Sequence, residues 1–243
     1  MILLSLQGIQ KSFGTNEDLR DASLVLQDGQ RMGLVGVNGC GKSTLFNLIA
    51  GLMQPDCGDI RLQGESMLLR PGLTGYMLQK DHLLEHRTIY KNIILGLEIQ
   101  HRLTEKNLEY VQKLMRQYGI ADFASSYPRE LSGGMRQRAA LIRTLALKPE
   151  FLLLDEPFSA LDYQTRLDVS DDIAKIIRQS GVTTLLVTHD LSEAISIADR
   201  IIVLGKRPGH IRKIVTIDFK TNKKLSSKEA RIHPKFQEYF NQI

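Results

Sequence analysis

Short apolar runs alternate with segments of helical periodicity along much of the chain. Residues 31–35 enter a glycine-rich turn, and the apolar positions after that turn predict a helix that stops at Gly51. Two further apolar runs, 151–154 and 183–187, end in polar residues. Apolar strands separated by helical segments are typical of a mainly parallel sheet with helices on both faces, which predicts an α/β fold.

The pattern near the N-terminus is different. Residues 1–6 predict a first β-strand and not a targeting signal, because the apolar run is brief and no basic residues precede it. The short alternating runs around 24–26, 60–62 and 75–77 predict strands of an antiparallel sheet. We therefore expect an N-terminal antiparallel β-subdomain beside the mainly parallel sheet.

Helical periodicity replaces the strand-like runs between residues 80 and 138. Apolar residues at helical spacing predict one buried stripe in this region, formed by Leu108, Val111, Leu114, Met115 and Tyr118. We expect an inserted α-helical subdomain at 80–138 within a single domain that spans 1–243. The segment 216–243 is expected to form a basic C-terminal tail.

The composition of the chain excludes a membrane span and a disulfide framework. Hydrophobic residues make up 42% and charged residues 24% of the chain, and no apolar run approaches the roughly 18 residues of a membrane span. Cys40 and Cys57 cannot form a disulfide framework, which favours a reducing cytoplasm. The net charge of +5 is modest. Its clearest concentration is in the tail, at Lys220, Lys223, Lys224, Lys228, Arg231 and Lys235. Such a tail is usually a solvated surface, with an anionic membrane face or an acidic partner as the alternative.

Residues 36–43 read Gly-Val-Asn-Gly-Cys-Gly-Lys-Ser and match the pattern of a phosphate-binding loop, after a strand and before a helix as required. The glycines let backbone N–H groups curl around phosphate oxygens. Lys42 is predicted to contact the β- and γ-phosphates as a point charge, and the Ser43 hydroxyl to ligate Mg²⁺. The helix that begins there directs its positive end at the same anion.

The apolar run 151–154 delivers two acids at the carboxyl end of a predicted strand. Asp155 is predicted to hold Mg²⁺, directly or through water. Glu156 is predicted to polarise the attacking water as general base, a role worth about 10²–10⁴-fold in rate. Adjacent acids at a strand end often mark only a solvated turn, but the phosphate-binding loop upstream favours the catalytic interpretation.

Residues 131–138 read Leu-Ser-Gly-Gly-Met-Arg-Gln-Arg and reproduce the signature motif of the ATP-binding cassette (ABC) family, which the chain resembles. Ser132 can cap a helix that begins there, and Gly133 and Gly134 leave backbone N–H groups free for an anion. The resemblance implies a P-loop NTPase fold and ATPase activity, with ATP and Mg²⁺ as ligands. It also implies a dimer in which each ATP lies between the phosphate loop of one copy and the signature motif of the other.

Further motifs follow in the order of that family, so the resemblance covers about residues 3–215. It implies that Gln79 senses Mg²⁺ and the attacking water, and that His189 contacts the γ-phosphate and positions the water. It also implies that Asp162 lies in a loop that passes information across the dimer. Phe13 is similar to the aromatic residue that stacks on adenine; the alternative is that it packs beneath the early sheet.

These inferences define the expected site. The expected catalytic residues are Glu156, His189 and Gln79, and the expected Mg²⁺ ligands are Ser43, Gln79 and Asp155. The expected nucleotide-binding residues are Phe13, Gly36, Asn38, Gly39, Cys40, Gly41, Lys42, Ser43, Thr44, Ser132, Gly133, Gly134 and Asp162.

Two segments, 156–162 and 206–211, resemble importer ATPases of the nitrate, sulfonate, taurine and pyrimidine-precursor group. The second contains an Arg-Pro-Gly turn, which is expected to join two strands. Segment 84–88 lacks the apolar Pro-Trp-like stretch of that group, so the surface that meets a membrane partner is unusual. Segment 142–145 carries Ile-Arg-Thr-Leu in place of Ala-Arg-Ala-Leu, which leaves Arg143 in place.

The resemblance implies the ATPase subunit of an importer for a small anionic or nitrogen- or sulfur-containing solute, at the cytoplasmic face of the cell membrane. Its expected partners are a second copy, separate transmembrane permease subunits that dock at about residues 80–102, and through them a solute-binding protein. The alternatives are an exporter ATPase or an ABC ATPase of a non-transport complex. The signature motif disfavours a P-loop kinase. No nucleic-acid partner is expected, because the chain has neither tandem cassettes nor a long coiled-coil insertion.

Overall fold

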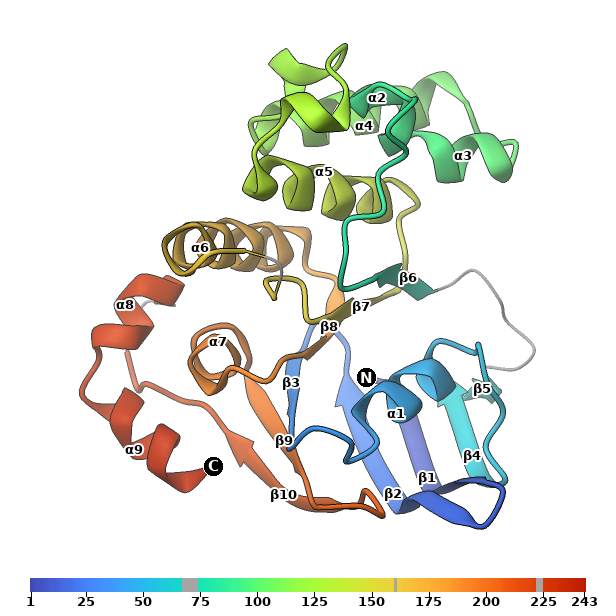
Figure 1. Ribbon diagram of the computed structural model, residues 1–243, viewed down its shortest axis with the longest axis vertical. Helices are drawn as coiled ribbons and strands as arrows, with labels where there is room; N and C mark the ends of the chain where they lie inside the picture. Colours follow the sequence, from blue (N-terminus) through green and yellow to red (C-terminus); the bar gives the residue numbers. More distant parts are fainter. Residues whose placement is uncertain (67–73, 160, 222–224) are drawn as a thin grey trace.

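The computed structural model describes residues 1–66, 74–159, 161–221 and 225–243. Within these ranges the strands form a four-stranded sheet in the order β2-β1-β4-β5 and a six-stranded sheet in the order β10-β9-β3-β8-β7-β6. Figure 1 shows helix α1 (Lys42–Ile49) between the two sheets and a group of helices at the top of the molecule. The expected α/β fold is confirmed.

The four-stranded sheet is antiparallel, as its alternating pattern predicts. It is formed by β1 (Ile2–Phe13), β2 (Asn16–Gln27), β4 (Cys57–Leu62) and β5 (Glu65–Ser66). Along β2, Ala22, Leu24 and Leu26 are buried while the residues between them are exposed, so one face of the sheet covers the core and the other meets solvent.

The six-stranded sheet is parallel except at one edge. Its strands are β3 (Arg31–Val35), β6 (Thr74–Met77), β7 (Phe151–Asp155), β8 (Thr183–Val187), β9 (Arg200–Leu204) and β10 (Ile211–Thr216). Strand β10 runs antiparallel to β9. The expectation that residues 75–77 belong to an antiparallel sheet is wrong, because β6 pairs in parallel with β7 from Thr74↔Phe151 to Met77↔Leu154. Alternation over so few residues does not fix the direction of pairing.

Strand β7 separates two cores, because all of its apolar side chains are buried and successive side chains point to opposite faces. Phe151 and Leu153 pack with α1 and the antiparallel sheet, whereas Leu152 and Leu154 pack with the helices on the other face. The continuous apolar run that marked this strand in the sequence follows from that burial on both sides.

The described residues between β6 and β7 are helical and contain no strand. They form α2 (Ile89–Ile93), α3 (Leu95–Ile99), α4 (Glu105–Gln117) and α5 (Gly133–Ala146), with short 3₁₀ turns at Ala121–Phe123 and Pro128–Glu130. The predicted stripe on α4 is confirmed: Val111, Leu114, Met115 and Tyr118 are buried, and Leu108 packs against the same core. Side chains of Thr88, Thr104 and Ser132 cap α2, α4 and α5.

The remaining helices follow β7: α6 (Tyr163–Ser180), α7 (Leu191–Ile197), α8 (Ser227–Ile232) and α9 (Lys235–Gln242). Two basic residues of the tail bind α6, since Lys228 lies 3.0 Å from Asp168 and Arg231 donates to the Ser170 hydroxyl at 3.0 Å. Lys223 and Lys224 fall outside the described residues. Part of the basic charge of the tail therefore attaches it to the body.

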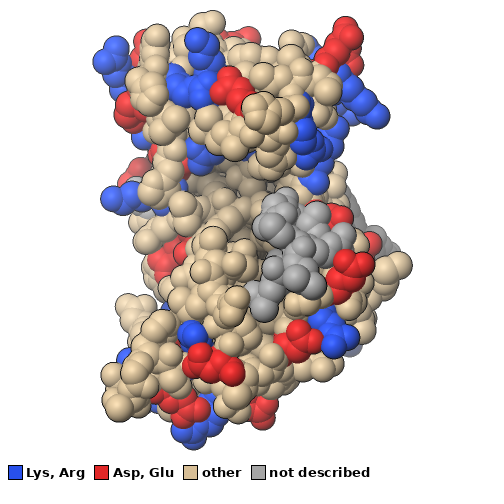
Figure 2. All heavy atoms as spheres, turned by 90° about the vertical axis from the view of Figure 1, so that its right-hand side faces the viewer, with Lys and Arg blue, Asp and Glu red and all other residues tan. Residues whose placement is uncertain are grey.

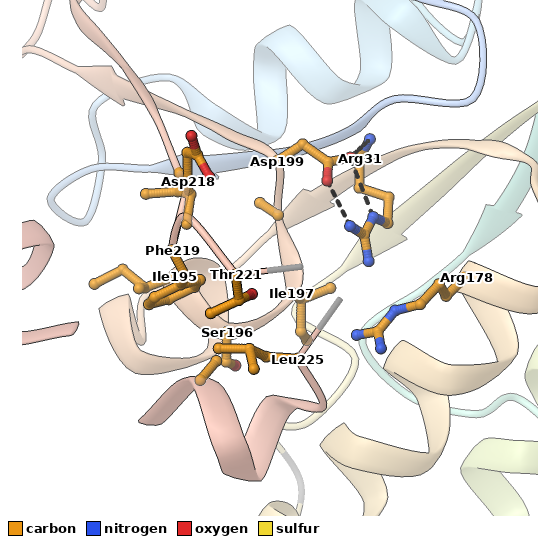
Figure 3. Close-up of a pocket in the computed structure, with 13 residues that line it drawn as sticks. Arg31, Arg178, Ile195, Ser196, Ile197, Asp199, Asp218, Phe219, Thr221 and Leu225 are labelled. Carbon is orange, nitrogen blue, oxygen red and sulfur yellow. Dashed lines mark hydrogen bonds and ion pairs between the residues drawn. The ribbon is translucent and has the colours of Figure 1, made fainter. Parts of the chain in front are cut away.

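A pocket of about 310 Å³ lies where the tail meets α6 and α7. Figure 3 shows the Arg31 guanidinium paired with Asp199 and the side chain of Arg178 beside them. Arg31 begins β3, so this pocket lies near the amino ends of the parallel strands. Among the described residues, no helix is long and apolar enough to cross a membrane.

Replacing Leu153 by Ala tests the division of the core. Leu153 is fully buried on β7, so the change should cost about 2–5 kcal/mol of unfolding free energy. Each kcal/mol should lower the melting temperature by about 2–4 °C in a chain of this size. Ile232→Ala, at a side chain that is 84% exposed, is the matched control and should change the melting temperature little. Similar melting temperatures for the two variants in calorimetry would contradict this description of the core.

Candidate nucleotide site

The loop between β3 and α1 carries the predicted phosphate-binding residues. Lys42 is buried, and its Nζ donates to the carbonyl oxygens of Gly36 at 2.9 Å and Val37 at 3.1 Å. The ammonium group therefore lies across the loop, where phosphate oxygens would compete for its hydrogens. Gly41 caps α1 with a φ of 95° and offers no side chain to block the amino end of the helix.

Close approach explains two of the glycines in this loop. A Cβ on Gly41 would lie 2.7 Å from Cδ2 of Leu19, and a Cβ on Gly36 would lie 2.7 Å from Sγ of Cys40. Gly39 has a φ of 75° and open space around it. The loop is thus pressed against β2 on one side and open on the other, as a loop that wraps an anion requires.

Asp155 ends β7 beside this loop. Burial raises the pKa of its carboxyl above the usual value, and the negative charge of Glu156 adds to the rise, while the Tyr76 hydroxyl and the Lys42 ammonium oppose it. Tyr76 donates its hydroxyl hydrogen to Asp155 Oδ2 at 3.4 Å. Burial and the neighbouring Asp155 raise the pKa of Tyr76 to about 12, which keeps this donor protonated. A half-buried carboxylate with few partners is well suited to a cation.

Glu156 lies at the centre of a cluster of polar groups. Its Oε2 is 3.3 Å from Nδ1 of His189 and 3.4 Å from Nε2 of Gln79. Gln79 also donates to the Ser159 hydroxyl at 3.1 Å. The structure therefore brings together all three residues predicted to be catalytic. Glu156 has a φ of 43°, an uncommon conformation for a residue other than glycine and one that is typical of functional sites.

The strand end that carries His189 is held by a buried pair. The Thr188 hydroxyl donates to the Glu193 carboxylate on α7 at 2.5 Å, and Asp190 caps the same helix through the backbone N–H groups of Ser192 and Glu193. Burial raises the pKa of Glu193. The position of His189 is thus fixed by the residues on either side of it.

The signature segment lies apart from the phosphate loop of its own chain. Ser132 caps α5 by accepting a hydrogen bond from the Met135 N–H at 3.4 Å, as predicted. A Cβ on Gly133 would lie 2.9 Å from Leu161, and one on Gly134 would lie 2.5 Å from Val169 on α6. Figure 1 shows the start of α5 in the upper part of the molecule, far from α1.

Two other predicted nucleotide-binding residues also lie outside the loop. Phe13 ends β1 with 46% of its surface exposed and Lys11 over its ring, so it does not pack beneath the sheet. Asp162 caps α6 through the Thr165 N–H at 3.0 Å, and hydrogen bonds from the side chain and the backbone of Thr165 lower the pKa of its carboxyl. Ala160, in the same loop as Asp162, falls outside the described residues.

The segment after Gln79 is attached to α5. Arg143 donates to the backbone carbonyls of Asp81 at 2.7 Å and His82 at 2.8 Å, and burial lowers the pKa of its guanidinium. Arg136 pairs with the carboxylates of Asp81 at 2.9 Å and Glu85 at 3.0 Å. The helix that begins at the signature motif is therefore joined by ion pairs and hydrogen bonds to the residues beside Gln79.

The donor set fits Mg²⁺. This ion prefers oxygen ligands and is usually held by one or two carboxylates, water and phosphate oxygens. Asp155, the exposed Ser43 hydroxyl and Gln79 offer such oxygens. Among the described residues, no three His, Cys, Asp or Glu side chains gather into a group that could hold a metal ion.

Several contacts of the site have no signal in the sequence. Tyr76 meets Asp155 from a strand 79 residues earlier, and Ser159 meets Gln79 across 80 residues. Asp18, which accepts from the Thr44 hydroxyl, precedes that residue by 26 positions. Only the three-dimensional fold brings these pairs together.

A P-loop fold with a phosphate-binding loop after β3, two acids at the end of β7 and a histidine after β8, the strand between them, defines a nucleotide hydrolase. The sequence profile of the ABC transporter family matches residues 19–159. The uncharacterized ABC transporter ATP-binding protein YtlC of Bacillus subtilis is 42% identical over 225 residues, which cover 93% of this chain and 86% of that protein. The aliphatic sulfonates import ATP-binding protein SsuB 1 of Xanthomonas axonopodis pv. citri is 37% identical over 223 residues, which cover 91% and 88%.

The fold agrees with these relatives. A dimeric ATP-binding cassette, solved in a post-hydrolysis state with ADP and Pi, superimposes with a TM-score of 0.73 at 25% identity and covers 89% of this chain and 99% of that chain. The chain belongs to the ABC transporter family and is an ATPase of the ATP-binding cassette type. Its resemblance to importer ATPases of the sulfonate group is confirmed.

Asp155→Asn should raise the melting temperature of the nucleotide-free protein at pH 7. The pKa of Asp155 is raised above 3.8 in the folded state, so folding disfavours its ionised form. That penalty is fully present above the folded pKa and is lost as the pH falls through this value toward 3.8. The stabilisation by Asn should therefore shrink on acidification.

Melting curves between pH 7 and about pH 4 check this expectation. Asp122→Asn, at an exposed carboxylate in the helical region, is the control and should have no such effect. A melting temperature for Asp155→Asn that is unchanged or lowered at pH 7 would contradict the electrostatic description of the site.

Proposed function

We propose that two copies of this chain bind two ATP molecules between them and couple ATP hydrolysis to solute movement through separate transmembrane subunits. The observation that carries the proposal is the cluster of Gln79, Glu156 and His189 beside the phosphate loop, in a chain whose helix α5 begins away from that loop (Figure 1). One chain supplies the hydrolytic groups but not the groups that close over the γ-phosphate.

In this mechanism Glu156 accepts a proton from the attacking water, and His189 contacts the γ-phosphate and orients that water. The phosphates are bound by the Lys42 ammonium and by backbone N–H groups of the phosphate loop and of Thr44 at the start of α1. Mg²⁺, held by Ser43, Asp155 and Gln79, would neutralise charge on the phosphate oxygens. Phe13 stacks on adenine.

The partner copy completes each site in this proposal. Its Ser132, Gly133 and Gly134 present the amino end of α5 to the γ-phosphate, and its Asp162 contacts the facing loop. The bare backbone of the two glycines and the positive end of a 14-residue helix suit an anion. ATP is then part of the interface, so the dimer depends on nucleotide.

The segment after Gln79 is the proposed docking surface for a permease. A groove of about 440 Å³ is lined by Lys80, Asp81, His82, Leu83, Gly133, Arg136, Gln137 and Leu161. It is bounded by the residues beside Gln79 on one side and by the start of α5 on the other. A helix of a transmembrane subunit that docks against residues 80–83, and leaves Gly133 to the second copy, would follow movements of the segment after Gln79. In Figure 2, Lys and Arg side chains gather over the helical part, and the surface below it is hollowed.

The relatives support a direction of transport and a place in the cell. The closeness to a sulfonate import protein favours import of a small anionic or nitrogen- or sulfur-containing solute, delivered to the permease by a solute-binding protein. The chain would then act at the inner face of the cell membrane, in the cytoplasm. Cys40 and Cys57 are both free, in keeping with a reducing compartment.

The dimer proposal is tested with Glu156→Gln. The change keeps the shape of the side chain and removes the anionic base, so hydrolysis should fall by about 10²–10⁴-fold while ATP and Mg²⁺ still bind. The closed pair should accumulate, so light scattering should detect a dimer with ATP and a monomer without it. Adding Ser132→Arg should abolish the dimer. A monomeric Glu156→Gln protein at saturating ATP would contradict the two-copy site.

The docking surface is tested by charge reversal at Lys80, an exposed residue that lines the groove. Lys80→Glu should impair transport by the assembled complex and leave the basal ATPase rate nearly unchanged, because the lysine contacts the partner and not the nucleotide. Lys106→Glu, on an exposed face of α4, is the matched control. Equal transport by the two variants in vesicles would place the coupling surface elsewhere. Glu85 and Arg87 are poorer probes, since each is already in an ion pair within the chain.

A further inference from the structure

The turn between β9 and β10 packs against β2 and the phosphate loop. It is closed by a hydrogen bond from the Gly205 N–H to the His210 carbonyl at 2.9 Å. The Gly209 N–H donates to the Asp18 carbonyl at 2.7 Å, and the Arg20 N–H donates to the Gly209 carbonyl at 2.9 Å. The turn that the sequence predicts as a connection of two strands is therefore also bonded to β2.

Gly209 lies directly against the loop that is proposed to bind phosphates. A Cβ at this position would lie 2.1 Å from the carbonyl oxygen of Cys40, a contact that no side chain can make without moving the loop. The same Cβ would lie 3.0 Å from Leu19, whose Cδ2 also limits Gly41. The turn, β2 and the phosphate loop thus form one packed unit.

Asp18 connects the polar groups of this unit. One carboxylate oxygen, Oδ2, accepts the hydroxyl hydrogen of Thr44 on α1, and the other, Oδ1, lies 3.0 Å from Nε of Arg207 in the turn. The Asp18 side chain is only 11% exposed, whereas that of Arg207 is 48% exposed. Thr44 gives its only hydroxyl hydrogen to Asp18, so it has none to donate to a phosphate.

The position of Asp18 has an electrostatic consequence. A negative charge that contacts Thr44, the third residue of α1, lies beside a loop that must receive a polyanion, and it repels that anion unless a cation compensates it. The Arg207 guanidinium is the cation that the structure places on Asp18. A neutral residue at 207 would leave the carboxylate, its hydrogen bond to Thr44 and its repulsion of phosphate in place.

We propose that Asp18 and Arg207 are a pair of positioning residues for ATP: Asp18 holds Thr44 at the start of α1, and Arg207 cancels the charge that this support brings to the phosphate loop. The proposal rests on the assignment of residues 36–43 as the ATP-binding loop. The turn at 205–210 would then contribute to ATP affinity in addition to connecting β9 and β10.

The test is a double-mutant cycle with ATP affinity, measured by calorimetry on the full chain. Arg207→Ala should weaken ATP binding by about five-fold at low salt and less at high salt, because the uncompensated charge is screened. The turnover number at saturating ATP should stay within about two-fold, since neither residue contacts the attacking water. Asp18→Asn should bind ATP at least as tightly as the unmodified chain, and Arg207→Ala combined with Asp18→Asn should regain the affinity.

The controls separate this proposal from neighbouring explanations. Arg212→Ala removes the same charge from an exposed position on β10 and should leave ATP affinity unchanged. An unchanged affinity for Arg207→Ala, or a double variant as weak as Arg207→Ala, would overturn the proposal. If Arg207→Ala fails to fold, Arg207→Gln in the same cycle replaces it, with circular dichroism to verify folding. ATP binding by Lys42→Ala equal to that of the unmodified chain would instead overturn the assignment of the loop itself.

Discussion

The parallel register of β3, β8 and β7 is the constraint on which the rest of the site depends. Val187 on β8 pairs with Leu34 on β3 and with Asp155 on β7, so the three strands end at the same level. The phosphate loop, Glu156 and His189 follow those strand ends within two residues. Groups far apart in the sequence therefore meet at one edge of the sheet, where parallel α/β proteins bind ligands. The Glu156 N–H donates to the Val187 carbonyl at 2.9 Å and extends this register by one bond.

Favourable burial along β7 is followed directly by two residues in unfavourable environments. Leu152, Leu153 and Leu154 are fully buried, and their burial gives β7 the apolar area that fixes its place. Immediately afterwards, Asp155 is an acid whose charge is disfavoured by burial, and Glu156 has a positive φ. The free energy gained by burying the apolar side chains of β7 offsets the cost of the buried charge of Asp155 and of the backbone conformation of Glu156. Such unfavourable residues are common at functional sites.

The sequence was most informative where a pattern is local. The apolar run 151–154 could predict a buried strand, and the glycine pattern at 36–43 could predict its loop, because each follows from neighbouring residues. Pairing across long separations could not be predicted in this way. The direction of β6 depends on its partner β7, and the Asp18 and Thr44 contact depends on how β2 crosses α1. A periodic pattern shows which side of a strand is buried, but it carries no information about which strand lies beside it.

Helix α5 connects the signature motif to the segment that follows Gln79. Its amino end carries Ser132 and lies away from the phosphate loop of its own chain, while Arg136 and Arg143 attach the same helix to the residues after Gln79. Ion pairs and hydrogen bonds therefore join the amino end of α5 to the segment after Gln79, and Gln79 contacts Glu156. In the proposed dimer this amino end meets the phosphate of the other copy, so the state of one ATP would act on the helical part of the neighbouring subunit. Under that proposal, hydrolysis and movement of the helical part would be a shared property of two chains.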